Sequence, residues 1–129
     1  MLENILSRIC RIPEELSLPG SKASMYSIVN SIDYKNIRSS IDEETLSLFI
    51  HSHIEVVQNW IYYSEDKRTS SGWFFTAIGN GWEVGRLMLD GNITAKGEYT
   101  SAANACAAFI LRELDSVQFG ETDAEIGFK

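Results

Sequence analysis

The sequence predicts an α+β domain: helices first, then a small antiparallel sheet, then a final helix. Three observations support this prediction. Apolar residues recur at helical spacing in the first half of the chain, aromatic and β-branched runs flank Asn80-Gly81, and an alanine-rich segment with helical spacing follows residue 100. Helices and strands that are segregated in this way are typical of α+β folds. The 129 residues correspond to one domain, 1–129.

Two short helices are predicted near the N-terminus. The first is amphipathic and is ended by Pro13, and the second follows the turn signal Pro19-Gly20. Their apolar positions are Leu2, Ile5, Leu6 and Ile9, and then Met25, Ile28, Val29 and Ile32.

One long central helix is predicted from Ile41 to about Tyr63, because this stretch contains no Pro or Gly. Ser40 and Glu43 have the spacing of a capping box at its start. Its apolar stripe is Leu46, Phe49, Ile50, His53, Val57, Trp60 and Ile61. Its polar face, which we expect to meet water or a partner, is Glu44, His51, Glu55, Gln58 and Tyr62.

A hairpin follows, with strands over 72–79 and 82–89. An Asn80-Gly81 turn between such runs is a strong hairpin signal, since a type I′ turn needs positive φ at both central residues. This turn pairs Ala77 with Val84 and Phe75 with Arg86. Both faces carry large apolar groups, so we expect helices on at least one side.

The turn signal Asp90-Gly91 precedes a weaker third strand from Asn92 to Tyr99, where Lys96 and Gly97 suggest a sheet edge. The sheet is therefore a hairpin or a three-stranded meander. Thr100 or Ser101 caps the C-terminal helix, which carries Ala103, Cys106, Ala107, Ile110, Leu111 and Leu114 at helical spacing. Residues 117–129 are predicted to be a loose acidic tail.

The acidic balance restricts the partners. Lys and Arg number 11 against 18 Asp and Glu, a formal net charge of -7, which argues against a nucleic-acid or anionic-membrane binder. No stretch approaches the roughly 20 apolar residues that span a bilayer, and the N-terminus lacks the apolar run of a secretion signal. With only two cysteines, we expect a cytoplasmic protein without a disulfide framework.

No catalytic motif stands out. His51 and His53 lie two residues apart, so on a helix they point to nearly opposite sides and cannot share a metal ion. His51 and Glu55 are i, i+4 and would share a helix surface. Cys106 lies on an apolar stripe without a basic neighbour, which indicates an inert core thiol. We therefore predict no enzyme activity, no cofactor and no metal site.

Four segments together resemble a type of small bacterial protein. They are 60–68, 72–75, 82–85 and 105–110, which combine aromatic residues with charges or alanines. In this combination of residues, the chain resembles immunity proteins of polymorphic toxin and contact-dependent growth inhibition systems. The resemblance implies a cytoplasmic, non-catalytic inhibitor that binds one cognate toxin domain, often a nuclease.

Carboxylates on this chain would complement the Lys and Arg with which a nuclease grips phosphates. We expect the toxin-binding residues to be Glu44, Glu55, Tyr62, Glu65, Asp66 and Glu83. Pairing of a toxin strand with the edge at 92–98 is a second mode that the sequence leaves open. Alternative functions are an assembly or adaptor subunit of a bacterial or phage complex and a small hydrolase that uses His51 and Glu55.

Overall fold

The computed structural model describes residues 2–20, 24–66 and 72–119 and confirms the predicted α+β class. The sheet is a three-stranded antiparallel meander in the order β1-β2-β3. The elements are α1 (Leu2–Cys10), α2 (Ile12–Leu16), α3 (Met25–Ser31), α4 (Tyr34–Ile37), the 3₁₀ turn η1 (Arg38–Ser40), α5 (Glu43–His51), α6 (Glu55–Asp66), β1 (Gly72–Ile78), β2 (Gly81–Leu87), β3 (Ile93–Tyr99) and α7 (Ala102–Phe119).

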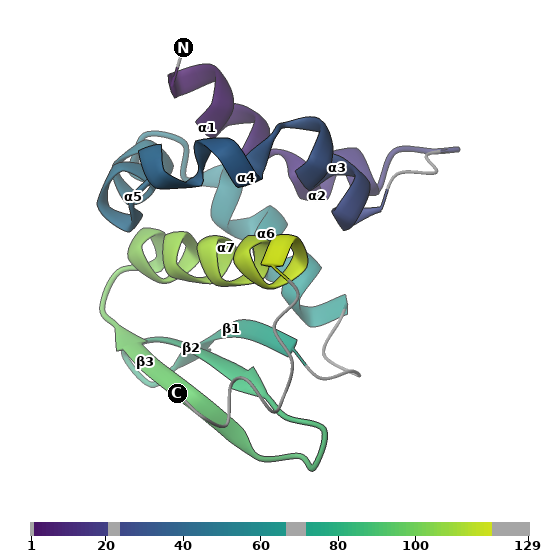
Figure 1. Ribbon diagram of the computed structural model, residues 1–129. Helices are drawn as coiled ribbons and strands as arrows, with labels where there is room; N and C mark the ends of the chain where they lie inside the picture. Colours follow the sequence, from purple (N-terminus) through teal and green to yellow (C-terminus); the bar gives the residue numbers. More distant parts are fainter. Residues whose placement is uncertain (1, 21–23, 67–71, 120–129) are drawn as a thin grey trace.

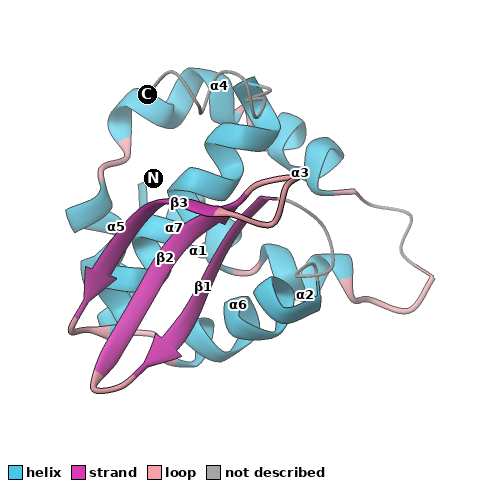
Figure 2. Cartoon of the chain, turned by 90° about the horizontal axis from the view of Figure 1, so that it is seen from below, coloured by secondary structure: helices cyan, strands magenta, loops and turns pink. Residues whose placement is uncertain are grey.

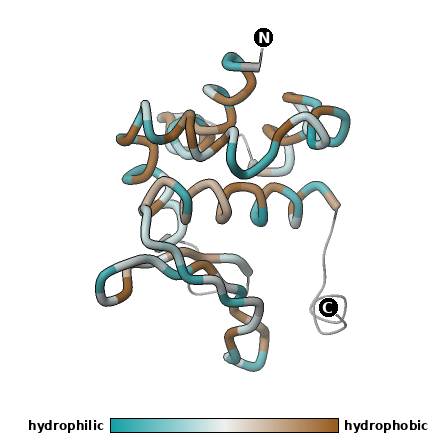
Figure 3. The backbone as a smooth tube through the Cα atoms, turned by 90° about the vertical axis from the view of Figure 1, so that its left-hand side faces the viewer, coloured by the Kyte–Doolittle hydropathy of each residue, from teal (hydrophilic) through white to brown (hydrophobic). Residues whose placement is uncertain are grey.

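Helix α7 lies at the centre of the molecule, between the sheet on one side and α1 to α4 on the other (Figure 1). Every residue from Ala105 to Leu111 is buried, so this stretch of the helix is covered all round. Figure 3 shows the same layers from the side, with hydrophobic stretches in the N-terminal helices, in α7 and in the strands. The alanine-rich helix α7 therefore packs against both layers.

The two predicted N-terminal helices form, with one change at Pro13. Helix α1 already ends at Cys10, and Pro13 lies in the first turn of α2, where a missing N–H costs no hydrogen bond. Helix α3 begins with a capping box in which Ser24 and Ser27 exchange hydrogen bonds. Proline thus starts a second short helix here.

The prediction of one long helix over 41–63 is wrong, because the chain breaks between α5 and α6. The His53 Nδ1 lies 3.0 Å from the Phe49 carbonyl oxygen, which the backbone N–H of His53 would occupy in a continuous helix. That N–H instead donates to Ile50, a tighter bond that closes the last turn of α5. The predicted Ser40 cap is also replaced, because Asp42 accepts the backbone N–H of Thr45 at 2.7 Å.

The hairpin forms, but its register is two residues away from the predicted one. Phe75 pairs with Val84 and Trp73 with Arg86, so the turn consists of Gly79 and Asn80. A two-residue shift leaves every side chain on its predicted face. Gly79 has φ +40 and Asn80 has no positive φ, which is the pattern of a type II′ turn with glycine first.

Gly81 accounts for the difference between the predicted turn, Asn80-Gly81, and the observed one. A Cβ at this position would lie 2.6 Å from the carbonyl oxygen of Tyr99, because β3 approaches the backbone of β2 closely there. Glycine is thus required within the strand. The third strand confirms the predicted edge, and its pairing with β2 shifts by one residue between Val84 and Arg86.

The predicted start of the loose tail, at residue 117, is wrong. Residues 117–119 continue α7 to Phe119, and the remainder of the predicted tail, 120–129, lies outside the described residues. Val117 still packs against the core, which extends the apolar stripe of α7 beyond Leu114.

A polar cluster joins α4 and η1 to α7. The Arg38 guanidinium donates to both carboxylate oxygens of Asp115, from Nε at 2.7 Å and from Nη2 at 3.2 Å. The buried Tyr34 hydroxyl donates to the same carboxylate at 2.6 Å. Burial, and then the hydrogen bond to Asp115, raise the pKa of Tyr34, so this phenol remains a donor.

Replacement of Asp115 tests this cluster. Asp115→Ala removes the acceptor of the buried Tyr34 hydroxyl and leaves the Arg38 guanidinium with only the Ile41 carbonyl oxygen, and we expect a loss of about 2–4 kcal/mol in the free energy of unfolding. Urea unfolding followed by tryptophan fluorescence measures it. The exposed control Glu3→Gln changes stability by less than about 0.5 kcal/mol. A loss equally small in Asp115→Ala would contradict this role.

Alanine at two glycines tests the close strand approach. Gly81→Ala forces its Cβ against the Tyr99 carbonyl oxygen, and we expect a loss of about 1–3 kcal/mol. In Gly97→Ala the new Cβ meets the Tyr99 ring at 3.4 Å, an ordinary contact, so stability should stay within about 1 kcal/mol of the parent. Thermal unfolding compares the two variants, and equal midpoints would show that β3 does not constrain Gly81.

Candidate functional site

Two neighbouring hollows share Tyr99, the last residue of β3, and we call them together the Tyr99 surface. The first, about 430 Å³, lies between α5 and the start of α7, and the second, about 380 Å³, lies at the hairpin end of the sheet. The first is lined by Glu43, Glu44, Ser47, Leu48, His51, Tyr99 and Asn104. The second is lined by 78–82, Glu98, Tyr99 and Thr100.

Local structure fixes the position of the acidic side chains. Asp42 caps α5, and its hydrogen bond from the Thr45 backbone lowers the pKa of its carboxyl. Glu43 and Glu44 follow in the first turn, where the positive helix end favours carboxylates. The Ser47 hydroxyl donates to the side-chain oxygen of Asn104, which ties α5 to α7 behind the first hollow.

The lining of the Tyr99 surface is negatively charged, although Arg112 acts electrostatically on Tyr99 and Arg38 on Glu43 from outside the hollows. Glu43, Glu44 and Glu98 line its hollows, and neither Lys nor Arg is among the described residues that do so. Burial, and then the negative charge of Glu43, raise the pKa of the Tyr99 phenol. Any cation placed here would therefore meet carboxylates and a neutral phenol.

A hollow between α1 and α2 has a different charge pattern. It is lined by Arg8 and Arg11 as well as Glu14 and Glu15. The opposite charges pair with each other, Arg8 with Glu15 at 3.6 Å and Arg11 with Glu14 at 3.3 Å. This hollow offers a partner no comparable excess of charge.

The predicted toxin-binding residues lie on several surfaces. Glu44 lines the first hollow, and Glu83 is the cross-strand neighbour of Glu98. Glu55 begins α6, whereas Tyr62, Glu65 and Asp66 lie in its second half. Tyr62 is 64% exposed and lines a separate hollow against α2. The structure therefore groups Glu44 and Glu83 near Tyr99 and leaves the other four on α6.

Sequence reasoning missed Glu43, Glu98 and Tyr99 as parts of one surface. Glu43 was noted only as a helix-start residue, and Glu98 and Tyr99 only as members of a weak strand. Their proximity arises from the packing of α5 beside the start of α7, which no local pattern reveals. The signal that was available is the pair of carboxylates in the first turn of α5.

The residues considered for catalysis do not form a pair. His51 is exposed at the end of α5, while Glu55 lies across the helix break at the start of α6. His53, expected to be packed in the apolar stripe, is instead exposed, although its ring stacks on Phe49 with a centroid distance of 4.3 Å. Within the described ranges, no group of three or more His, Cys, Asp or Glu has the arrangement of a metal site.

The interior also contains charged groups. The Tyr63 hydroxyl donates to the buried Glu113 at 2.5 Å. On the helix-facing side of the sheet the guanidinium carbon of buried Arg86 lies 5.9 Å from the Trp73 ring centroid, and that of Arg112 lies 5.7 Å away. These groups join α6, α7 and the sheet and form part of the scaffold behind the surface.

The comparisons with known proteins add no family. No protein-family model matches the chain, and neither does any curated protein or solved structure. Among the helices of the described residues, none has the length and apolar character needed to cross a membrane. Function is therefore inferred from the chemistry of the Tyr99 surface.

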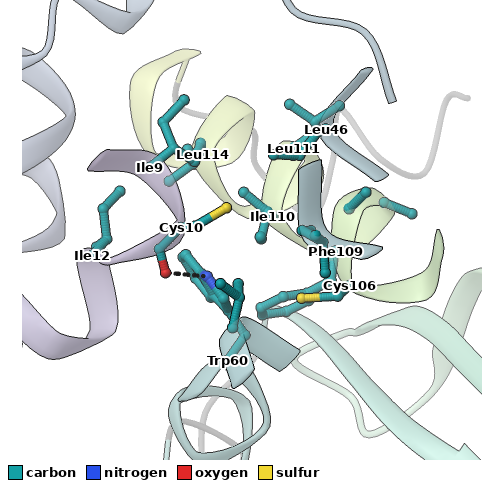
Figure 4. Close-up of a cluster of buried hydrophobic side chains, with 14 of the residues drawn as sticks. Ile9, Cys10, Ile12, Leu46, Trp60, Cys106, Phe109, Ile110, Leu111 and Leu114 are labelled. Atoms are coloured by element: carbon teal, nitrogen blue, oxygen red, sulfur yellow. Dashed lines mark hydrogen bonds between the residues drawn. The ribbon is translucent and has the colours of Figure 1, made fainter. Parts of the chain in front are cut away.

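Both cysteines are core residues, which confirms the predicted core position of Cys106. Cys10 and Cys106 lie within the buried cluster shown in Figure 4, where the Trp60 indole N–H donates to the Cys10 carbonyl oxygen at 3.1 Å. Burial raises the pKa of Cys10 to about 12. Burial, and then the proximity of Cys10, raise the pKa of Cys106 well above its usual range.

Thiol labelling tests this burial. At pH 8 both groups remain thiols, so a disulfide reagent should react with neither cysteine of the native protein within the time in which it modifies a free thiol. Both should react once guanidinium chloride unfolds the chain. Immediate labelling of native protein would contradict the buried positions.

Proposed function

We propose that this protein is an immunity protein that binds and neutralises one cognate bacterial toxin domain, without catalysis of its own. The observation that carries the proposal is the Tyr99 surface, where Glu43, Glu44 and Glu98 surround an aromatic side chain and no basic residue of the described chain lines the hollows. Such a surface complements a partner rich in Lys and Arg.

Charge and shape act together in this proposal. A toxin that grips phosphates presents a basic surface, and an acidic protein steers its own association with that surface. The exposed Leu48 and the partly buried Tyr99 and Trp82 supply apolar and aromatic area among the carboxylates. Interfaces gain most of their affinity from such anchors and much of their specificity from the surrounding charges.

The positions of the reactive side chains also favour recognition by a surface over catalysis. The thiols of Cys10 and Cys106 are in the core, and His51 and Glu55 belong to different helices. The chemistry considered for a small hydrolase thus lacks the paired geometry that general acid–base catalysis requires. The Tyr99 surface, in contrast, brings together residues from α5, β3 and α7.

Co-expression tests the proposal directly. We expect the adjacent upstream gene to encode the toxin domain, which should inhibit growth when expressed alone, and this protein should restore growth and purify as a complex with it. Neither protection nor a complex would refute the proposed function.

Charge removal tests the assigned surface. The triple variant Glu43→Gln, Glu44→Gln and Glu98→Gln should slow association with the toxin domain by about tenfold or more at low salt, because steering depends on these charges. Stopped-flow fluorescence measures the association rate.

A second triple variant provides the matched control. Glu3→Gln, Glu14→Gln and Asp33→Asn changes the net charge equally at exposed positions on other elements. It should retain an association rate within about twofold of the parent. If the control slows association and the first variant does not, the interface lies elsewhere and the assignment to Tyr99 is wrong.

A further inference from the structure

The sheet has one face without a helix. Helices α6 and α7 pack on the side of Trp73, Phe75 and Val84. On the opposite side, no helix of the described chain covers the strands, as Figure 2 shows from below. We call this the open face, and its side chains include Phe74, Ile78, Glu83, Leu87, Ile93 and Glu98.

One end of the open face is an apolar cluster. Phe74 and Ile93 reach across Gly85 from the two outer strands, since a Cβ on Gly85 would lie 3.0 Å from Phe74 Cζ and 3.2 Å from Ile93 Cγ2. Leu87 pairs with Ile93 beside them. Ile93 nevertheless remains 43% exposed, so the cluster is not fully covered by its own residues.

The other end carries two carboxylates directly opposite each other. Glu83 on β2 pairs with Glu98 on β3. Like charges at directly opposed positions destabilise a sheet. Lys96 on β3 is exposed, and no ion pair within 4 Å joins it to either carboxylate in the part of the chain that the structure describes. With Lys96 as a nearby cation on the same strand, the two carboxylates still leave this end of the face with a net negative charge.

We propose that the open face docks a basic amphipathic segment of the partner protein, so that apolar side chains cover Phe74, Leu87 and Ile93 while a Lys or Arg lies between Glu83 and Glu98. This inference rests on the proposed function and extends it. The open face continues into the Tyr99 surface, because Ile78 and Glu98 belong to both.

The charge of the face selects the class of partner. Two opposed carboxylates repel the phosphates of nucleic acids and of anionic lipids, whereas they attract an ammonium or guanidinium group. The neighbouring apolar cluster requires that the cation be carried by a segment with apolar side chains. A basic amphipathic protein segment has both properties.

Neutral variants of the two carboxylates test the docking face. In the free protein, Glu83→Gln removes the repulsion and should raise the thermal midpoint by about 1–3 °C. In the complex with the upstream toxin domain, the double variant Glu83→Gln and Glu98→Gln should raise the Kd by about tenfold or more. Glu3→Gln should alter neither quantity. Thermal unfolding and isothermal titration calorimetry measure them.

The outcomes separate this inference from the proposed function. If the toxin domain binds and the double variant retains the parental Kd, the open face is not the docking site, while the proposed function stands. If the parent binds no toxin domain, the proposed function fails. Docking at the open face is then tested separately with a synthetic peptide. An alternating leucine–lysine peptide should shift the methyl NMR signals of Leu87 and Ile93, and a leucine–glutamate analogue should not. Equal shifts with both peptides, or none with either, would overturn the inference.

Discussion

The burial of Ala105–Leu111 of α7 on all sides is the constraint on which the other elements depend. Phe109 on this helix meets Trp60, Tyr63 and Phe75, with ring centroids 5.9, 6.4 and 5.0 Å away, so one side chain joins α6 and the sheet. Burial of a large apolar side chain stabilises the fold by about 1.5–3 kcal/mol. The small residues Ala105, Ala107 and Ala108 let the surrounding layers approach closely. With its interior occupied in this way, the chain offers a partner its outer faces.

Local patterns predicted what local physics determines. The spacing of apolar residues located α1, α3 and α7, and the turn glycines located the strands. The sequence could not reveal the break at His53, since the approach of its ring nitrogen to the Phe49 carbonyl oxygen, at 3.0 Å, exists only in the folded geometry. Nor could it reveal the hairpin register, because Asn80-Gly81 is a good turn locally and the approach of Tyr99 to Gly81 is a long-range contact. The predicted helix over 41–63 was expected to be central, but α7 lies at the centre of the molecule. This arrangement also depends on long-range contacts that local patterns do not reveal.

The candidate site was less accessible from sequence than the fold. A negative net charge and a carboxylate-rich helix start are visible in the residues, and they led to Glu44 and Glu83. The meeting of Glu43, Glu44 and Glu98 around Tyr99 depends on where α5 packs relative to β3. The acidic character of the Tyr99 surface was thus predictable from the sequence, whereas its position was not. The structure places these carboxylates on two adjoining faces, the Tyr99 surface and the open face.

The most direct test is a hydrogen–deuterium exchange footprint of the protein bound to the proposed partner, the product of the adjacent upstream gene. We expect hydrogen exchange of the amides in 43–51 and 81–100 to slow on binding. We expect no change in Ala105–Leu111, which the fold already buries. Protection confined to α1, α2 and the second half of α6, with 43–51 and 81–100 unchanged, would contradict the assignment of recognition to these two faces.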